Sequence, residues 1–358
     1  MKSLQIQSKI KDYTVSFEND FDFLDNLSRI AEKVVIIDKI VFDLYAEIFT
    51  KKFDRLDRII LEATEENKTL DYAKSIYEIL VKKSVKKNLN IISIGGGITQ
   101  DITGFVASTL YRGVNWIYLP TTFLAQTDSC IGSKTSLNFQ SNKNLIGTFY
   151  PPTEIYINTT FLNTLPEVDF FGGIGETIKF QLMREVYPKD FGAIVEAVNC
   201  AAGKESLLPL IFDNMQVKLS YMAGDEFDQG RRNLLNYGHC FGHAIETTSN
   251  YYIPHGIAVI IGIIFANTIS KNRLLVSAET SDFLNKNLLL PNIPLKLKKE
   301  HFNMQILKSM KSDKKRVGEH LTVVIPDEEF RLTKVDNVTE SEFIKSFDET
   351  VNILFGSK

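Results

Sequence analysis

The first half of the chain alternates short runs of β-branched residues with segments of helical spacing. Residues 34–37 (VVII) and 91–94 (IISI) are typical of buried strands, and residues 70–85 carry apolar side chains at helical intervals. Two further runs, at 116–119 and 154–157, have the same strand character. Because strands that alternate with helices form parallel sheets, the sequence predicts an α/β domain with a parallel sheet.

The second half of the chain has a different pattern. Long helical segments are expected at 170–183, 207–222, 235–249 and 257–271. A chain of 358 residues exceeds the ~250–300 residues at which single cores stop growing, so two domains are expected. We predict an α/β domain over residues 1–158 and a mostly α-helical domain over residues 159–358. The sequence contains no flexible Gly/Ser linker, which favours closely packed domains with a cleft between them.

Charge and composition exclude several classes of partner. The 41 basic and 44 acidic residues are mixed along the chain, so we expect no nucleic-acid partner. No apolar run approaches the ~20 residues that span a bilayer, and the N-terminal segment lacks the apolar region of a signal peptide. The three cysteines have no CxxC spacing, which indicates neither a disulfide framework nor a cysteine-ligated zinc. We therefore expect a cytoplasmic protein without membrane contacts.

Three consecutive glycines, Gly95, Gly96 and Gly97, follow the strand predicted at 91–94 and precede a helical run at 102–110. This placement lets backbone N–H groups and a helix N-terminus approach a pyrophosphate. A glycine triplet after a strand also forms tight turns, and this one is not the GxGxxG fingerprint. From the triplet alone, nucleotide binding and a structural turn are equal alternatives.

Histidines cluster in one stretch of the second half. His239 and His243 are four residues apart and therefore share one face of a predicted helix, and His255 opens the next helix. Imidazoles at this spacing can ligate a metal, or place one ligand beside an acid–base group. An HxxxH pair is nevertheless more often structural than functional.

Glu176 and Lys179 are three residues apart and could form a surface ion pair. Their apolar neighbours Ile174 and Ile178 favour a buried setting, in which an ionised pair needs partners. Glu176 with two of the imidazoles would form a His₂Glu set with an open position, which is the ligand pattern of catalytic zinc.

Side chains that can bind phosphate or carboxylate occur in both predicted domains. They are Lys134, Lys143, Asn144, Lys218, Arg232, Asn236, Lys314 and Lys315. Most lysines lie on solvated faces, so residue type alone assigns no role to any of them.

Together these segments resemble the dehydroquinate synthase family, over residues 34–326. The stretches that carry the resemblance are GGGITQD, YRGVNWIYLPTTFLAQTDSCIGSKTSLN, KNLIGTFYPP, FLNTLP, GIGETIKF, RRNLLNYGHCFGHAIE, HGIAV and SDKK. The resemblance implies a dehydroquinate-synthase-like fold and an NAD- and metal-dependent sugar-phosphate cyclase. Its substrate would be 3-deoxy-arabino-heptulosonate 7-phosphate, and its products 3-dehydroquinate and phosphate.

The resemblance also implies a role for individual residues. Contacts with NAD fall on Asp38, Glu65, Lys68, Gly95, Gly96, Gly97, Asp101, Thr121, Thr122, Lys134 and Lys143. The ligands of a divalent metal, zinc or cobalt, fall on Glu176, His239 and His255, in agreement with the His₂Glu set. Contacts with the sugar polyol fall on Asp128, Asn144 and Lys179, and contacts with its phosphate on Lys134, Asn236, His243 and Lys314.

Two further matches bear on assembly and substrate. Arg112 matches an arginine that a neighbouring subunit contributes, which implies a homodimer. Lys218 and Arg232 match the pair that holds the substrate carboxylate, which favours a substrate that carries one.

The implied reaction uses NAD transiently. Hydride leaves a ring alcohol, the resulting ketone acidifies the neighbouring C–H, and phosphate departs by β-elimination. Hydride then returns, the ring opens, and an intramolecular aldol step closes the carbocycle. The metal would polarise the oxygens that change, and His243 would transfer protons.

Four positions depart from the family pattern. Gln100, Ser133 and Ser136 replace glycines, and Ile257 replaces an acidic residue. These changes leave open a cyclase of specialised metabolism that acts on a related sugar phosphate. Two alternatives of other classes are a metal-dependent polyol dehydrogenase, which would produce net NADH, and a catalytically silent homologue.

Overall fold

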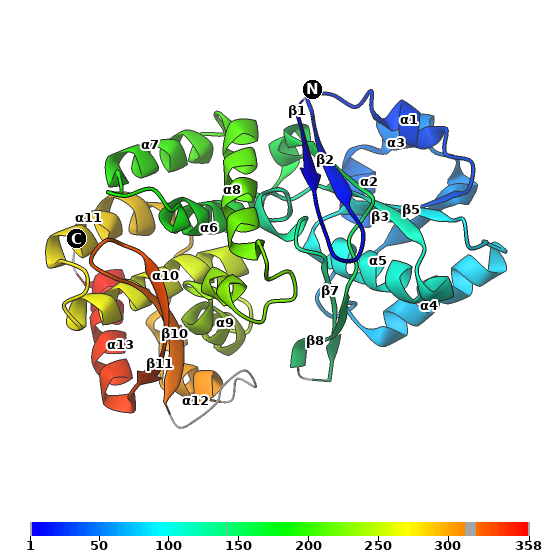
Figure 1. The fold of residues 1–358 in the computed structure, drawn as a ribbon. Coiled ribbons are helices and arrows are strands. Elements are labelled where there is room, and N and C mark those ends of the chain that lie inside the picture. The colour runs from blue at the N-terminus through cyan, green and yellow to red at the C-terminus, as the bar shows by residue number, and fades with distance from the viewer. Residues whose placement is uncertain (1, 141, 312–319, 357–358) are drawn as a thin grey trace. The chain divides into compact units, whose positions relative to one another are not determined.

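The computed structural model describes residues 2–140, 142–311 and 320–356. The chain divides into two compact units, Met1–Leu165 (unit 1) and Pro166–Lys358 (unit 2). Figure 1 colours unit 1 from blue to green and unit 2 from green to red.

Unit 1 is built on a seven-stranded sheet with the order β1-β2-β9-β6-β5-β3-β4, counted over the described residues. Its strands are β1 (Lys2–Ile6), β2 (Tyr13–Glu18), β3 (Lys33–Asp38), β4 (Arg58–Leu61), β5 (Asn90–Gly95), β6 (Asn115–Pro120) and β9 (Glu154–Asn158). β1 pairs antiparallel with β2, and the remaining neighbours pair in parallel. The predicted parallel α/β architecture is confirmed.

Unit 1 also contains five α-helices, counted over the described residues, and a hairpin that is separate from the seven-stranded sheet. The helices are α1 (Leu24–Ser28), α2 (Lys39–Leu44), α3 (Ala46–Lys52), α4 (Leu70–Lys82) and α5 (Gly97–Thr109), and the hairpin consists of β7 (Lys134–Phe139) and β8 (Asn142–Phe149). Apolar side chains of β3, β5 and β6 form one core with α1 and α3. β7 packs against α4 and α5, and the backbone N–H of Asn138 donates to the carbonyl of Lys68 at 2.7 Å. The hairpin is thereby fixed beside the segment that precedes α4.

Unit 2 is mostly helical, as predicted. Its helices are α6 (Glu167–Met183), α7 (Phe191–Ala202), α8 (Leu207–Met222), α9 (His239–Thr248), α10 (His255–Asn272), α11 (Ala278–Leu284), α12 (Gln305–Lys311) and α13 (Glu340–Phe355), and a hairpin joins β10 (Leu321–Pro326) and β11 (Leu332–Val338). The helix predicted from residue 235 begins only at His239. Gly238 adopts a φ of +78°, which ends the preceding 3₁₀ turn at Arg231–Asn236 and starts α9 afresh.

Helix α10 is the central element of unit 2. All of its residues from Gly256 to Ser270 are buried, and it packs against α6, α9 and α13. A helix that is apolar on every side requires such enclosure. Across the part of the chain that the structure describes, no helix combines the length and apolar character needed to cross a membrane.

Glycines let α10 approach its two neighbours at backbone distance. A Cβ atom added at Gly175 of α6 would lie 2.1 Å from the carbonyl oxygen of Gly256. On the other side of α10, a Cβ at Gly262 would lie 1.8 Å from the carbonyl oxygen of Gly238. Because both distances are far below van der Waals contact, these helices can be this close only where side chains are absent.

Candidate active site

The close helix contacts of unit 2 bring three ionisable side chains together. Glu176 follows Gly175 on α6, His239 follows Gly238 at the start of α9, and His255 precedes Gly256 at the start of α10. Each of the three residues therefore sits next to a glycine at which two backbones touch. The same glycines that allow the packing determine where these side chains meet.

The carboxylate of Glu176 is the centre of this cluster, and its side chain is fully buried. The Nε2 atoms of His239 and His255 lie 3.3 Å and 3.2 Å from the same oxygen, Oε1. The ammonium group of Lys179 forms an ion pair with the other oxygen, Oε2. The surface ion pair that spacing alone allows is thus excluded, because both partners are buried among further polar groups.

The Nδ1 atoms of both imidazoles contact groups that orient the rings. His239 Nδ1 lies 3.1 Å from the carbonyl oxygen of Tyr237, and His255 Nδ1 lies 3.1 Å from Oε2 of Glu246. Metal-binding histidines generally donate their second ring N–H to a carbonyl or a carboxylate in this way. Both rings therefore present Nε2 toward Glu176.

Glu246 orients the ring of His255, a role that the sequence did not indicate. It lies on α9, one turn after His243, whereas the ring that it contacts belongs to α10. The only available signal was the acidic residue at the end of GHAIE, which follows the histidines at helical spacing.

His243 completes a group of three imidazoles. Its ring centroid lies 5.2 Å from that of His239 and 5.3 Å from that of His255. One nitrogen of each ring can be chosen so that all three lie within 4.8 Å of one another. His239 and His243 thus share one face of α9, as their spacing predicts, and His243 is the exposed member of the group.

The electrostatics of the cluster favour an ionised Glu176, a neutral His239 and a protonated His255. Burial raises the pKa of Glu176, but Lys179 and His239 outweigh it, so the pKa lies well below its usual range. Burial and the charge of Lys179 lower the pKa of His239. For His255, burial lowers the pKa, but its contacts with Glu176 and Glu246 outweigh burial and raise the pKa to about 10.

The donor set Glu176, His239 and His255 fits a divalent metal, and the separations of Glu176 from the two imidazoles fit tetrahedral coordination. Ligand atoms about 2.0–2.1 Å from such an ion lie about 3.3–3.4 Å from one another. The separations of 3.3 Å and 3.2 Å between Glu176 Oε1 and the two Nε2 atoms match this value. A set that includes Glu176 suits a divalent cation better than three imidazoles, because the buried carboxylate supplies negative charge.

In unit 1, predicted NAD contacts lie at the carboxyl ends of three neighbouring strands. Asp38 ends β3, Gly95 ends β5, and Thr121 follows β6. Ligands of open α/β sheets bind at this edge. A Cβ at Gly95 would lie 2.4 Å from Thr99 Oγ1, so the glycine is needed for the turn into α5. The tight turn and a nucleotide site are therefore compatible in one structure.

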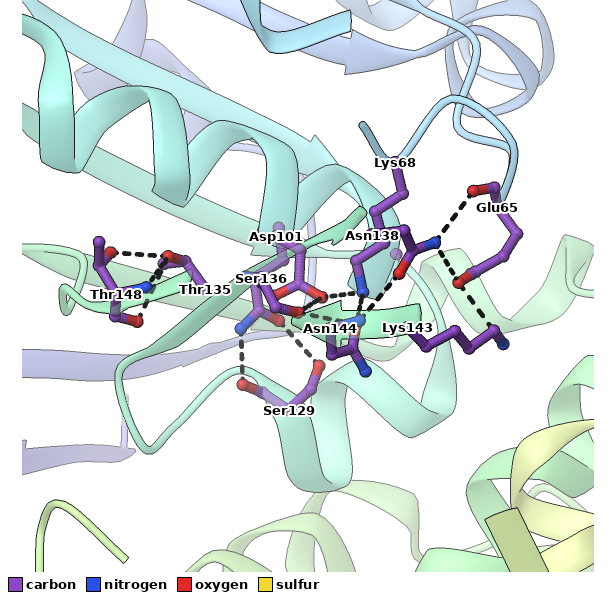
Figure 2. A network of polar contacts seen from close by, with 12 residues as sticks. Glu65, Lys68, Asp101, Ser129, Thr135, Ser136, Asn138, Lys143, Asn144 and Thr148 are labelled. Carbon is purple, nitrogen blue, oxygen red and sulfur yellow. Dashed lines mark hydrogen bonds and ion pairs between the residues drawn. The ribbon is translucent and has the colours of Figure 1, made fainter. Parts of the chain in front are cut away.

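A second group of predicted contacts forms a polar network between the segment before α4, helix α5 and the β7–β8 hairpin (Figure 2). Lys68 Nζ lies 2.5 Å from Asp101 Oδ2 and 2.6 Å from Asn144 Oδ1. Lys143 Nζ lies 3.4 Å from Glu65 Oε1. Burial raises the pKa of Asp101, while Lys68 and Ser136 offset part of this effect. The network contains four predicted NAD contacts and one predicted polyol contact.

The other predicted substrate contacts are distributed over both units. In unit 1, Asp128 lies in the turn Ala125–Ser129, Lys134 begins β7, and Arg112 is exposed with a φ of +63°. In unit 2, Lys218 is buried on α8, and Arg232 is buried with its guanidinium donating to the carbonyl of Glu226. Asn236 donates to the carbonyl of Asn233 at 2.9 Å. Lys314 and Lys315 lie outside the described residues. In unit 1, Thr122 precedes the turn Ala125–Ser129 and lies beside Gly96. A Cβ atom added at Gly96 would lie 2.9 Å from the methyl group of Thr122.

Asp225 is compatible with a structural role for Arg232 beside substrate binding, because backbone N–H groups first, and also the charge of Arg232, lower the pKa of this nearby carboxylate. The carboxylate of Asp225 accepts backbone N–H groups of Gln229, Gly230 and Arg232 at 2.8, 2.8 and 2.9 Å. These bonds shape the loop before the 3₁₀ turn. Through the loop, they place the buried guanidinium of Arg232.

Comparison with known proteins identifies the relatives of this chain. The sequence-family model for the 3-dehydroquinate synthase N-terminal region matches residues 58–171, and the family model for the C-terminal region matches residues 173–316. The 3-dehydroquinate synthase of Clostridium tetani (strain Massachusetts / E88) is 35% identical over 326 residues, which cover 90% of this chain and 86% of that protein. The 3-dehydroquinate synthase of Streptococcus equi subsp. equi (strain 4047) is 32% identical over 342 residues, with 91% and 92% covered.

Among solved structures, a 2-deoxy-scyllo-inosose synthase complexed with carbaglucose-6-phosphate, NAD⁺ and Co²⁺ has a TM-score of 0.81 at 25% identity. The likeness covers 97% of this chain and 100% of that one. The fold and the sequence thus define a member of the sugar-phosphate cyclase superfamily. Within it, the chain belongs to the 3-dehydroquinate synthase family, which confirms the resemblance carried by the sequence motifs.

Proposed function

We propose that this protein is a 3-dehydroquinate synthase that converts 3-deoxy-arabino-heptulosonate 7-phosphate to 3-dehydroquinate and phosphate. The observation that carries the proposal is the buried Glu176 with two imidazole Nε2 atoms directed at one of its oxygens, in a chain of this family. Such a site can hold a Lewis acid beside a polyol.

The proposed metal ligands are Glu176, His239 and His255, with zinc or cobalt as the ion. The proposed NAD site is the edge of the sheet in unit 1 formed by Asp38, the glycines of 95–97 and the Thr121-Thr122 pair. When bound, NAD would supply a reversible hydride transfer and the metal would polarise substrate oxygens.

The chain's own residues would bind and orient the substrate. The buried cations Lys218 and Arg232 suit a substrate carboxylate, because charge-assisted hydrogen bonds to an arginine fork are strong. Lys134, Asn236, His243 and Lys314 would bind the phosphate, and Asp128, Asn144 and Lys179 the polyol. His243 is the exposed imidazole of its cluster and is therefore placed to exchange a proton with a substrate.

A homodimer is proposed from Arg112 alone. Arg112 is exposed at the end of the 3₁₀ turn Leu110–Arg112, which follows α5, and exposure leaves the residue accessible to a neighbouring subunit. A dilute monomer that retained full activity, measured by sedimentation and assay together, would contradict this part of the proposal.

The reaction is tested by measuring phosphate release and NADH together. With NAD and a divalent metal present, the protein should release phosphate from 3-deoxy-arabino-heptulosonate 7-phosphate without net NADH. The matched variant Glu176→Gln, which keeps the side-chain shape and removes the charge, should lose metal affinity and turnover. Release only from a heptulose phosphate without a carboxylate would indicate another cyclase, and net NADH with glycerol-like alcohols would indicate a polyol dehydrogenase.

The NAD site has a test of its own. Saturating NAD should raise the thermal unfolding temperature, because a ligand that binds only the folded state stabilises it. An unchanged unfolding temperature at saturating NAD would contradict the site at Gly95–97.

A further inference from the structure

The backbone of Asn144 has an unusual conformation in the β7–β8 hairpin. Its φ is +52°, in the left-handed region that asparagine tolerates better than most residues. Its N–H donates to Asn138 Oδ1 at 2.9 Å, and the Asn138 amide donates in turn to Glu65 Oε1 at 2.8 Å. These hydrogen bonds hold the backbone of Asn144 in place.

The side-chain amide of Asn144 has a defined orientation. Lys68 Nζ donates to its oxygen Oδ1 at 2.6 Å, and a lysine ammonium has donors only. The amide oxygen must therefore face Lys68. The amide nitrogen Nδ2 is left as the donor that the side chain can offer to another group.

Ser136 connects this amide to the carboxylate of Asp101 (Figure 2). Its hydroxyl can donate its single proton to Asn144 Oδ1 at 2.9 Å or to Asp101 Oδ2 at 3.0 Å, and its backbone N–H donates to Asp101 Oδ1 at 3.0 Å. Glycine at this position would keep the backbone bond and lose both hydroxyl contacts. Glycine is also the residue that the resemblance to the family leads us to expect at position 136.

We propose that Ser136 is a positioning residue for Asn144. Together with Lys68 it holds the amide with Oδ1 toward the network, so that Nδ2 donates to an alcohol oxygen of the sugar phosphate. The part that concerns the sugar rests on the proposed function, in which Asn144 contacts the polyol. A substrate group that meets Asn144 must then be a hydrogen-bond acceptor.

The first test replaces the hydroxyl of Ser136. Loss of one neutral hydrogen bond changes an equilibrium about three- to tenfold. Ser136→Ala should therefore raise KM for 3-deoxy-arabino-heptulosonate 7-phosphate about three- to tenfold, with a smaller change in kcat and in the Kd for NAD. Ser136→Thr, which retains a hydroxyl at this position of β7, should keep KM near the wild-type value. The matched control is Ser75→Ala on α4, which removes a hydroxyl bond of 2.7 Å to the Tyr72 carbonyl and should leave KM unchanged.

The second test asks whether Ser136 acts through Asn144. In an Asn144→Ala background, Ser136→Ala should raise KM by less than about twofold, because the group that it positions is gone. An undiminished effect in that background would overturn the proposal. A Kd for NAD that rises as much as KM would also overturn it, because Ser136 would then serve the cofactor side of the network.

A thermal unfolding cycle with the same three variants separates this inference from the proposed function. If Ser136 and Asn144 are in contact, the two single shifts in unfolding temperature should sum to about 2–4 °C more than the shift of the double variant. Additive shifts would overturn the contact whatever the substrate is. Absence of phosphate release from the wild-type protein would instead overturn the proposed function, and the thermal cycle would still report on the positioning of Asn144.

Discussion

Replacing Glu246 tests whether the ring of His255 is held for metal binding. The carboxylate of Glu246 lies 3.1 Å from His255 Nδ1, and its side chain is only 12% exposed. In the neutral ring that would bind a metal, a hydrogen bond to Nδ1 fixes the tautomer in which Nε2 carries the lone pair, and it fixes the plane of the ring. In Glu246→Ala the imidazole can rotate and take the other tautomer, so fewer molecules present Nε2 toward Glu176.

The expected loss of metal affinity follows from the general effect of removing a group that orients a metal-binding histidine. Removing the partner of a metal-binding histidine weakens metal affinity about 10- to 100-fold, or about 1.4–2.7 kcal/mol. Glu246→Gln retains a neutral acceptor at nearly the same place. It should therefore lose affinity by a factor of only about three to ten.

The assay is a competition between the metal-free protein and a chromophoric chelator for Zn²⁺ or Co²⁺. The matched control is Glu342→Ala, which removes another carboxylate of unit 2, paired with Arg273 at 2.6 Å and 2.8 Å. The control should lower the unfolding temperature without weakening metal affinity. If Glu246→Ala binds metal as tightly as the wild type, the contact with His255 is only structural and the reasoning is wrong.

Three further predictions concern other parts of the chain. Arg232→Ala should reduce kcat/KM for the heptulosonate phosphate by about one to two orders of magnitude, and much less for a heptulose phosphate without the carboxylate. Equal losses on both substrates would point to a structural role. Ser133 has a φ of +64° and a buried hydroxyl without a partner in the described residues, so Ser133→Gly should raise the unfolding free energy by about 1 kcal/mol. A lower unfolding temperature in calorimetry would contradict this. Burial lowers the pKa of Lys189 to about 8, so between about pH 8 and 10.5 the unfolded chain binds more protons and stability should rise with pH. Urea unfolding at both ends of this range should show a smaller rise for Lys189→Met.

The parallel strands were predictable because their apolar residues form uninterrupted runs in the sequence. β3 and β5 are covered on both faces, so nearly every side chain is apolar and the runs VVII and IISI are visible without alignment. The β7–β8 hairpin was missed for the opposite reason. Its side chains Ser136, Asn138 and Asn144 serve a polar network, and a hairpin with polar contacts loses the alternation that marks a half-buried strand.

The candidate site was predictable as a set of residues but not as a geometry. Spacing alone left metal binding and a structural role open for His239 and His243, and the resemblance to the family selected the proposed ligands Glu176, His239 and His255. The contact between Glu246 and His255 joins two helices, and no periodicity within either helix reports it. The start of α9 was placed four residues too early because Leu235 extends the apolar pattern, whereas the left-handed Gly238 interrupts the helix.

The glycine contacts of α10 have a consequence for how mutations in this protein should be read. A methyl group at Gly256 would fall 1.9 Å from the carbonyl oxygen of Gly172, so alanine there must separate α6 from α10. Since Glu176 and His255 lie beside this contact on opposite helices, the separation moves them apart. In a screen that scores activity alone, these glycines would be indistinguishable from catalytic residues, although none of their atoms takes part in the chemistry.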